Sequence, residues 1–436
     1  MKLTTITVKE YSCFCNGGEN IENGKFLNGY YALKKSTFDL LERFALENTR
    51  EGKDEALEIM GISARRGIGK IITVKNYVGV ISLNDGTTIE ILPKIHSNED
   101  SDNERQLVVK MLNTLYNVSS KNLQTAKLNV CKMNILEAFI RMFVDEVIRL
   151  IKQGLKSDYE TLEDNLTCVK GKIQFSQHIR HNFAHNERVY VAYDEFTVNR
   201  PENKLLKSTL LYLHSHTRSS RNKKDIKNLL SIFSDVEPSS NYDVDFSRIV
   251  LDRNTKAYSN ALNWSRVFLK RKSFTSFSGS TVSMALLFPM EKLFECYIAT
   301  LLRRELTPKG YTVSTQDRGY YLFDSPKKFS LRPDIVVKDK EENIYILDTK
   351  WKLLNSKFSA NYGISQSDMY QMYAYHKKYE TNSSVSGVIV IYPQILGDFE
   401  ITPFSSNDNV KVNIHFFDMF TIENSIKKIE EIMKKS

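Results

Sequence analysis

The stretch that most constrains the fold of this chain is residues 331–352, whose pattern predicts a β-hairpin. Two short apolar runs, 335–337 and 344–347, flank a charged turn centred on Glu341. Because successive side chains of a strand point to opposite faces, a turn of this length fixes which residues pair and which face each side chain occupies.

This turn places Asp334 directly opposite Asp348. Carboxylates in such a pair have Cβ atoms about 4.5–5.5 Å apart, and like charges there destabilise a sheet. A divalent cation with oxygen ligands would offset the repulsion. Alternation along the second strand puts Lys350 on the same face as Asp348 and Thr349 on the other. Two acids and a lysine are therefore expected to converge on one point.

Such a cluster is typical of a metal-dependent phosphodiesterase. Asp334, Asp348 and the backbone carbonyl of Thr349 would hold one or two Mg²⁺ ions, which activate a bound water and stabilise charge on a phosphate. Lys350 would position that water and stabilise the transition state. The alternative is a surface hairpin with incidental acids, because Asp-x-Lys also occurs elsewhere in this chain, at residues 225–227.

The helix expected at 289–302 carries two further acids, Glu291 and Glu295, one turn apart on one face. Glu295 follows an apolar Leu-Phe pair that would anchor this part of the helix to the sheet, so we expect Glu295 in the site and Glu291 as an accessory residue. The alternative is that both glutamates face solvent.

A later helix, expected at 366–379, places Gln371 and Tyr375 on one face at a spacing of four residues. Gln371 is a candidate for a hydrogen bond to a DNA phosphate or a metal-bound water. The alternative is that the amphipathic helix is simply packed against the sheet.

The composition indicates a cytoplasmic protein with an anionic partner. The net charge of +9 favours a polyanion, although basic proteins without such partners are common. The five cysteines are odd in number and mostly isolated, which favours reduced thiols. No run of about 18 apolar residues predicts a membrane span, and the N-terminus lacks the apolar core of a signal peptide.

The length of 436 residues predicts two or three domains. The pattern predicts a β-containing N-terminal domain at 1–130, a mainly helical connector at 131–280 and a mixed sheet flanked by helices at 281–436. The predicted fold class is therefore α/β, in a multidomain α+β arrangement.

A glycine-containing basic loop at residues 64–71 superficially suggests a phosphate-binding loop. Such a loop requires a glycine where this chain has Ala64 and a serine or threonine where it has Ile71. We therefore expect no nucleotide to be bound by this chain, and interpret the loop as a solvated turn or a backbone contact to a partner or DNA.

Taken together, several segments resemble a known family. The pattern of Pro333-Asp334, Asp348-x-Lys350 and the Gln371/Tyr375 pair is similar to the RecB-like branch of the PD-(D/E)xK nuclease superfamily. Nearly the whole chain resembles the McrC family, in segments at 89–95, 169–173, 199–205, 293–295, 332–334 and 347–352.

The resemblance implies a PD-(D/E)xK nuclease core in 281–436 and a DNA endonuclease subunit of a GTP-dependent, McrBC-like restriction complex that cuts double-stranded foreign DNA with Mg²⁺. It also implies a hexameric AAA+ GTPase partner, McrB, engaged and stimulated by the N-terminal part at 1–130. Extra helical material in the middle departs from shorter members, which leaves the domain boundaries open.

Two alternatives remain at this point. One is a free-standing DNA repair nuclease that needs only the metal. The other is a non-catalytic regulatory subunit that activates an NTPase.

Overall fold

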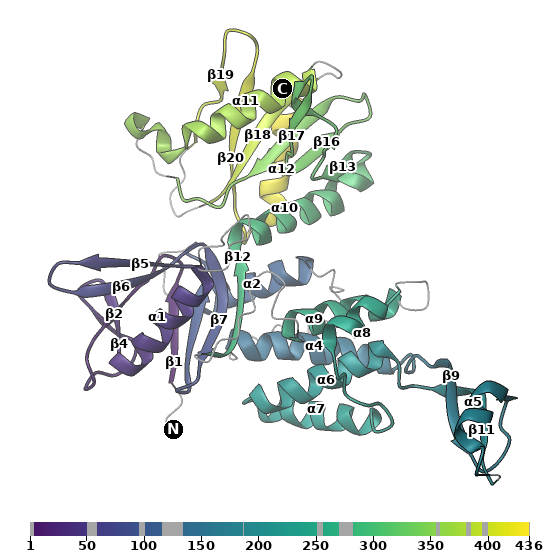
Figure 1. The fold of residues 1–436 in the computed structure, drawn as a ribbon. Helices are drawn as coiled ribbons and strands as arrows, with labels where there is room; N and C mark the ends of the chain where they lie inside the picture. Colours follow the sequence, from purple (N-terminus) through teal and green to yellow (C-terminus); the bar gives the residue numbers. More distant parts are fainter. Residues whose placement is uncertain are drawn as a thin grey trace. The chain divides into compact units, whose positions relative to one another are not determined.

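The computed structural model forms two compact units, one of Met1–Ile135 with Phe277–Ser436 and one of Leu136–Ser276 (Figure 1). The predicted boundaries at 130/131 and 280/281 lie outside the described residues, and the three-part division stays a prediction. The structure describes residues 4–49, 59–95, 101–115, 134–185, 187–250, 256–269, 282–354, 358–380, 385–394 and 400–435.

The N-terminal part of the first unit contains two sheets, with strand orders β3-β4-β2-β6-β5 and β1-β8-β7-β12. Their strands are β1 (Thr4–Lys9), β2 (Cys13–Asn16), β3 (Lys25–Leu27), β4 (Tyr30–Leu33), β5 (Met60–Arg65), β6 (Gly69–Val74), β7 (Tyr77–Leu83), β8 (Thr87–Leu92) and β12 (Val282–Pro289). Two helices accompany them, α1 (Lys35–Thr49) and α2 (Ser101–Leu115).

One hydrophobic core joins α1 to both of these sheets. Phe38, Leu41 and Phe44 recur at a spacing of three residues, so they share one face of the helix. They pack with Phe14 of one sheet and Ile81 of the other. The apolar face of α1 is therefore what holds this helix to the sheets.

Strand β12 lies late in the sequence but pairs antiparallel with β7. The two backbones approach closely at Gly79, which has φ 138° and where a Cβ atom would lie 1.9 Å from the carbonyl oxygen of Leu286. Only glycine fits such a position. The predicted division assigned all of 281–436 to the C-terminal domain, whereas the structure pairs β12 with the N-terminal sheet.

The second unit is mainly helical, with a small three-stranded sheet in the order β10-β11-β9. Trp264 stacks on Phe268 at 5.8 Å between ring centroids and contacts Phe139 at 6.2 Å, which builds a buried aromatic core. Its elements are α4 (Ile135–Ile151), β9 (Asp158–Leu166), β10 (Lys172–Ile173), α5 (Phe175–Asn182), β11 (Val189–Thr197), α6 (Pro201–His216), α7 (Ser220–Ile232), α8 (Tyr242–Arg248), η2 (Lys256–Tyr258) and α9 (Ser259–Leu269).

The C-terminal part of the first unit is built on a six-stranded mixed sheet with the order β13-β16-β17-β18-β20-β19, and a separate two-stranded sheet, β14-β15 (Figure 1). The strands are β13 (Thr312–Thr315), β14 (Tyr321–Asp324), β15 (Lys327–Ser330), β16 (Ile335–Lys338), β17 (Ile344–Thr349), β18 (Val385–Pro393), β19 (Phe404–Ser405) and β20 (Lys411–Phe417). The helices are α10 (Met290–Leu306), η3 (Thr307–Lys309), η4 (Phe358–Gly363), α11 (Gln366–Glu380) and α12 (Ile422–Lys435).

Both faces of this sheet are covered. Alternate residues, including Ile346 and Val390, form one core with Met372 and Tyr375 of α11. The residues between them, such as Leu347, are buried as well, and α10 and α12 also contact the strands. Strands β17, β18 and β20 run parallel, which explains why 387–392 is a continuous apolar run rather than an alternating one.

The mixed α/β character predicted from the sequence is confirmed, with some differences in the elements. The apolar segment at 71–81 forms parts of two strands, because the chain turns at Lys75 and Asn76 between β6 and β7. Strand β15 was not expected, since its sequence, Lys-Lys-Phe-Ser, has little apolar character.

Candidate functional site

The hairpin of β16 and β17 sets the position of both predicted acids. Its ladder pairs Ile335 with Leu347 and Lys338 with Ile344, which is the predicted register. Asp334 immediately precedes the first of these pairs, and Asp348 follows Leu347 near the end of β17. The neighbouring parallel strand β18 also pairs with Asp348, which is only 1% exposed. The sheet therefore holds a buried carboxylate in a central strand.

Asp334 is fixed by Thr349 on the opposite strand. Its Oδ2 atom accepts hydrogen bonds from the backbone N–H of Thr349 at 2.8 Å and from the Thr349 hydroxyl at 2.7 Å. Sequence reasoning gave Thr349 a role through its carbonyl oxygen alone. The structure adds a second role, in which the hydroxyl and amide set the orientation of the Asp334 carboxylate.

Lys350 lies between the acid pair and α11. Its ammonium is 2.7 Å from Oδ2 of Asp348 and donates a hydrogen bond of 3.2 Å to Oε1 of Gln371. The side-chain amide of Gln371 donates in turn to the hydroxyl of Tyr375 at 2.7 Å. The structure thus brings these four predicted residues into one chain of contacts from β17 to the helix.

Of the two glutamates on α10, the structure connects only Glu295 to this region. Gln316 links them, because its amide side chain donates to Glu295 at 2.6 Å while its backbone N–H donates to the carbonyl of Asp334 at 3.1 Å. Lys292 lies 2.9 Å from both oxygens of Glu295. Glu291 instead accepts a hydrogen bond from Asn76 of the N-terminal part. Nothing in the sequence around Gln316 marked it as a candidate.

The electrostatics of the cluster reflect an excess of buried negative charge. Burial, together with the charges of Asp348 and Glu295, raises the pKa of Asp334 to about 7. Burial also raises the pKa of Asp348, although Lys350 opposes this. The pKa of Lys350 is raised despite its burial, because Asp348 and Asp334 stabilise its charge. One lysine therefore does not neutralise the acids, and the site favours an additional positive charge.

The donor set suits a hard cation. Oδ2 of Asp348 faces the ammonium of Lys350 and accepts no hydrogen bond of regular geometry within the described part of the chain. Mg²⁺ is commonly held by one or two carboxylates and several waters. Among the described residues, no three His, Cys, Asp or Glu side chains form a ready-made coordination shell. Asp334, Asp348 and the backbone carbonyl of Thr349 therefore stay the predicted protein ligands, and water would complete the shell.

Trp351, directly after the lysine, connects the site to the N-terminal strands. Its indole N–H lies 3.1 and 3.2 Å from the two carboxylate oxygens of Glu10, and its ring contacts Phe294 edge-on at 5.2 Å. Burial raises the pKa of Glu10 to about 8. Glu10 and Trp351 line a cavity of about 240 Å³ together with Tyr11, Lys94, Lys352 and Leu353. No sequence pattern pointed to this pair.

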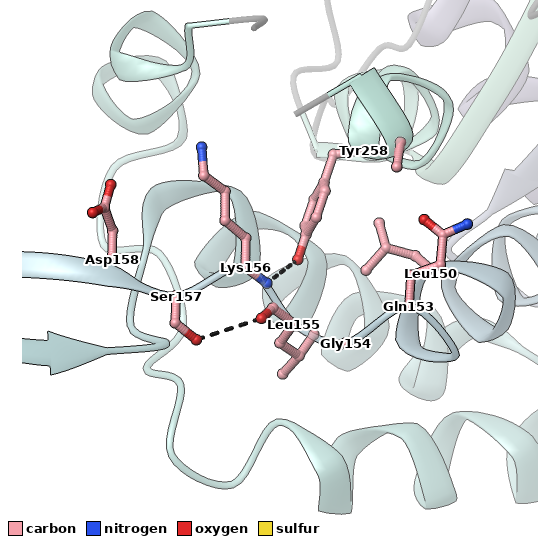
Figure 2. Close-up of a pocket in the computed structure, with 9 residues that line it drawn as sticks. Leu150, Gln153, Gly154, Leu155, Lys156, Ser157, Asp158 and Tyr258 are labelled. Atoms are coloured by element: carbon pink, nitrogen blue, oxygen red, sulfur yellow. Dashed lines mark hydrogen bonds between the residues drawn. The ribbon is translucent and has the colours of Figure 1, made fainter. Parts of the chain in front are cut away.

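A larger cavity, of about 390 Å³, lies in the second unit at the end of α4 (Figure 2). The backbone N–H of Lys156 donates to the hydroxyl of Tyr258 there at 2.7 Å, and Tyr258 donates onward to Asn203. The cavity contains none of the predicted site residues. Its tyrosine acts as a bridge between the chain after α4 and α6, so we interpret it as a structural feature.

Comparison with known proteins identifies the family. A family model described as McrBC 5-methylcytosine restriction system component matches residues 72–393, which include the acid pair, Lys350 and Glu295. The chain belongs to this family. The resemblance to McrC drawn from the sequence is thereby confirmed.

The similar proteins share little sequence identity with this chain. The chain is 23% identical over 285 residues to the type IV methyl-directed restriction enzyme EcoKMcrBC of Escherichia coli (strain K12), and the match covers 60% of this chain and 78% of that protein. Two solved structures of the McrBC complex of Thermococcus gammatolerans share the fold. One, of McrB AAA+ hexamers with bound McrC, has a TM-score of 0.69 at 18% identity and covers 98% of this chain and 100% of the matched chain. The second has a TM-score of 0.52 at 19% identity over 70% and 88% of the two chains.

Among the helices in the described ranges, none combines the length and the apolar character needed to cross a bilayer.

Proposed function

We propose that this McrBC component is the DNA-cleaving subunit of its restriction complex. In this proposal the predicted domain at 281–436 contains, in the part that follows β12, a PD-(D/E)xK nuclease core that hydrolyses phosphodiester bonds of double-stranded DNA with Mg²⁺. The observation that carries the proposal is the geometry of the acid pair: Asp348 is 1% exposed and lies 2.7 Å from the ammonium of Lys350, and Asp334 is oriented by Thr349 on the opposite strand.

Each side chain has a role that follows from its contacts. Bound Mg²⁺ would supply an activated water and stabilise charge on the scissile phosphate. The ligands would be Asp334, which Thr349 orients, Asp348 and the backbone carbonyl of Thr349. Lys350, held by Gln371, places its ammonium where it can position the water and stabilise the added charge of the transition state. Tyr375 fixes the amide of Gln371.

Glu295 is the weaker member of this proposed site. It contributes to the raised pKa of Asp334 and is tied to the same strand end by Gln316. Lys292 contacts both of its carboxylate oxygens, so a role in holding metal-bound water requires that Lys292 move away. Glu291, bonded to Asn76, has no place in the proposed chemistry.

The proposed partner is an AAA+ GTPase of the McrB type, whose GTP hydrolysis the chain stimulates. Support comes from the likeness to the chain in the structure described as McrB AAA+ hexamers with bound McrC and from the family match. We assign partner binding to residues 1–130, as the family resemblance implies. GTP would bind to the partner, since the loop at 64–71 lacks the residues of a phosphate-binding loop.

The proposal is tested by reconstituting the chain with its GTPase partner and measuring DNA cleavage and GTP hydrolysis in the same samples. Asp348→Asn should abolish cleavage and leave stimulation of GTP hydrolysis intact. Asp225→Asn is the matched control, because it alters the Asp-x-Lys sequence on α7 that pairs with Arg141; it should leave both activities unchanged.

Other outcomes of the experiment would decide against the proposal. Cleavage by the chain with Mg²⁺ alone, without GTP or partner, would indicate a free-standing nuclease. Stimulation of GTP hydrolysis with no cleavage by the unaltered complex would indicate a non-catalytic regulatory subunit.

A further inference from the structure

The two-stranded sheet of β14 and β15 exposes large apolar side chains. Phe329 is 72% exposed, Phe323 56% and Leu322 37%. An isolated two-stranded hairpin is only marginally stable in water, and a hairpin becomes stable when its apolar side chains pack against the rest of the protein. Exposed apolar groups gathered on so small an element are a mark of an interaction surface.

The backbone of this hairpin is strained at Phe329, the most exposed of its three large apolar residues. Phe329 has φ 58°, a left-handed conformation that is uncommon for a bulky side chain. Its ring lies edge-on to Phe323, with 5.8 Å between the centroids. Such strain persists where the surrounding structure imposes it and tends to occur at functional sites. Here it places two aromatic rings together on an exposed surface.

The charges around these rings select the kind of partner. Lys327 and Lys328 of β15 are exposed, and so are Arg318 and Arg332 on the two sides of the hairpin. The acid of β14, Asp324, is paired with Lys378 at 2.8 Å. The surface therefore combines aromatic rings with an excess of positive charge, which is the chemistry that proteins use to bind nucleic acid.

The hairpin is also anchored to the proposed site. Its second strand leads directly into Asp334, and Tyr320, just before β14, packs on Tyr379 of α11 with 3.9 Å between ring centroids. Tyr379 follows Gln371 by two turns of the helix, a rise of about 12 Å. At about 3.4 Å per base pair, this distance corresponds to three or four base pairs of duplex.

We propose that the β14–β15 hairpin contacts the substrate DNA a few base pairs from the scissile phosphate. Lys327 and Lys328 bind backbone phosphates, while Phe323 and Phe329 pack against bases or sugars exposed by local distortion of the duplex. This inference rests on the proposed nuclease function and goes beyond it, because it names a DNA-binding element outside the acid cluster.

The test uses the full chain carrying Asp348→Asn, so that bound DNA is not cut, and a fluorescent duplex with or without a short unpaired stretch. Phe323→Leu/Phe329→Leu removes the rings and keeps apolar volume, and should weaken binding by about tenfold or more, as expected for lost stacking contacts. Lys327→Gln/Lys328→Gln should reduce the slope of log affinity against log salt by about 2, since each phosphate contact contributes about 0.9.

A matched control lies on β3, where Lys25 and the 60% exposed Phe26 are adjacent. Lys25→Gln/Phe26→Leu should leave DNA affinity unchanged. Thermal unfolding of every variant shows whether its fold is retained. If a leucine variant is unfolded, Phe329→Tyr, which keeps a ring, should bind DNA as the parent chain does.

Unchanged DNA affinity in both hairpin variants would overturn the inference. So would a loss of GTPase stimulation with unchanged DNA affinity, because this result would assign the hairpin to a protein contact. DNA cleavage by the complex is measured separately, with and without Asp348→Asn. If Asp348→Asn abolishes cleavage while the hairpin variants bind DNA normally, only the inference about the hairpin fails and the proposed function stands.

Discussion

Two buried acid sites in the first unit differ in how their charge is neutralised. Glu90, in the middle of β8, is 0% exposed and accepts four well-formed hydrogen bonds. Arg105 donates two of them at 3.0 and 2.7 Å, and the hydroxyl of Thr7 and the backbone N–H of Ile135 donate the others. Of the other pair, Asp334 accepts hydrogen bonds from Thr349, and Asp348 faces a single cation, Lys350.

The two sites differ because one acid stabilises the fold and the other two are candidates for catalysis. A buried charge that is fully paired holds a particular arrangement of the chain, and removal of its partner is strongly destabilising. Acids whose partners leave net negative charge have raised pKa values, and such groups concentrate at functional sites. Glu90 is an example of the first kind, and the Asp334/Asp348 pair of the second.

The largest expected effect is on cleavage. Asp334→Asn or Lys350→Ala should lower the cleavage rate of the assembled complex by at least about 10³-fold, the upper end of the cost of losing one transition-state contact. Asp334→Asn should not lower the free energy of unfolding, because it relieves repulsion with Asp348. Chemical denaturation of the same sample provides this second measurement, and a large loss of stability would show that the Asp334 carboxylate stabilises the fold as Glu90 does.

For Glu90 we expect the opposite pattern, a loss of stability without a loss of cleavage. Arg105→Met leaves Glu90 buried without its cation and should lower the free energy of unfolding by about 3 kcal/mol or more. Cleavage per folded molecule should stay unchanged at a temperature where the variant is folded. A specific loss of cleavage with full stability would place Glu90 in the chemistry instead.

The dependence of stability on pH sharpens the contrast. Metal-free protein holds a proton on Asp334 up to about pH 7, whereas the unfolded chain releases it near pH 4. The folded state therefore binds more protons in this window, and stability should fall as pH rises from about 4 to 7, by at most about 1.4 kcal/mol per pH unit.

Two controls isolate this effect. Glu10, whose pKa burial raises to about 8, titrates in the same direction, so the quantity to compare is the difference in slope between the parent chain and Asp334→Asn. Saturating Mg²⁺ should flatten the slope in the parent chain, because the metal competes with the proton. Equal slopes for the two proteins would contradict the raised pKa of Asp334.

The smallest expected effect concerns the link between Glu10 and Trp351. Trp351→Phe keeps a ring against Phe294 but removes the indole N–H, and should lower the free energy of unfolding by about 1 kcal/mol. Glu10→Gln retains an oxygen acceptor for the indole and should cost less. Denaturant titration of both variants shows which of them loses more free energy of unfolding. A larger loss in Glu10→Gln than in Trp351→Phe would show that the Glu10 charge itself is needed.

Sequence reasoning succeeded where the determinants are local. The turn around Glu341 fixes the hairpin register, and helical spacing fixes the Gln371–Tyr375 pair, so both could be predicted. Contacts between distant segments could not be. Gln316 reaches Glu295 only because β13 and α10 meet in the fold, and Glu10 meets Trp351 across 341 positions of sequence. Glu291 was predicted as an accessory residue from its spacing to Glu295, whereas its hydrogen-bond partner, Asn76, lies between β6 and β7 in the N-terminal part.

A crystal of this chain soaked in Mn²⁺ and measured for anomalous scattering tests most directly whether the acid pair binds a metal ion. The predicted result is a peak between the carboxylates of Asp334 and Asp348, and none at the fully paired Glu90. The absence of a peak at Asp334 and Asp348 at saturating Mn²⁺ would show that the two acids do not hold a metal ion, and would contradict their proposed role as ligands.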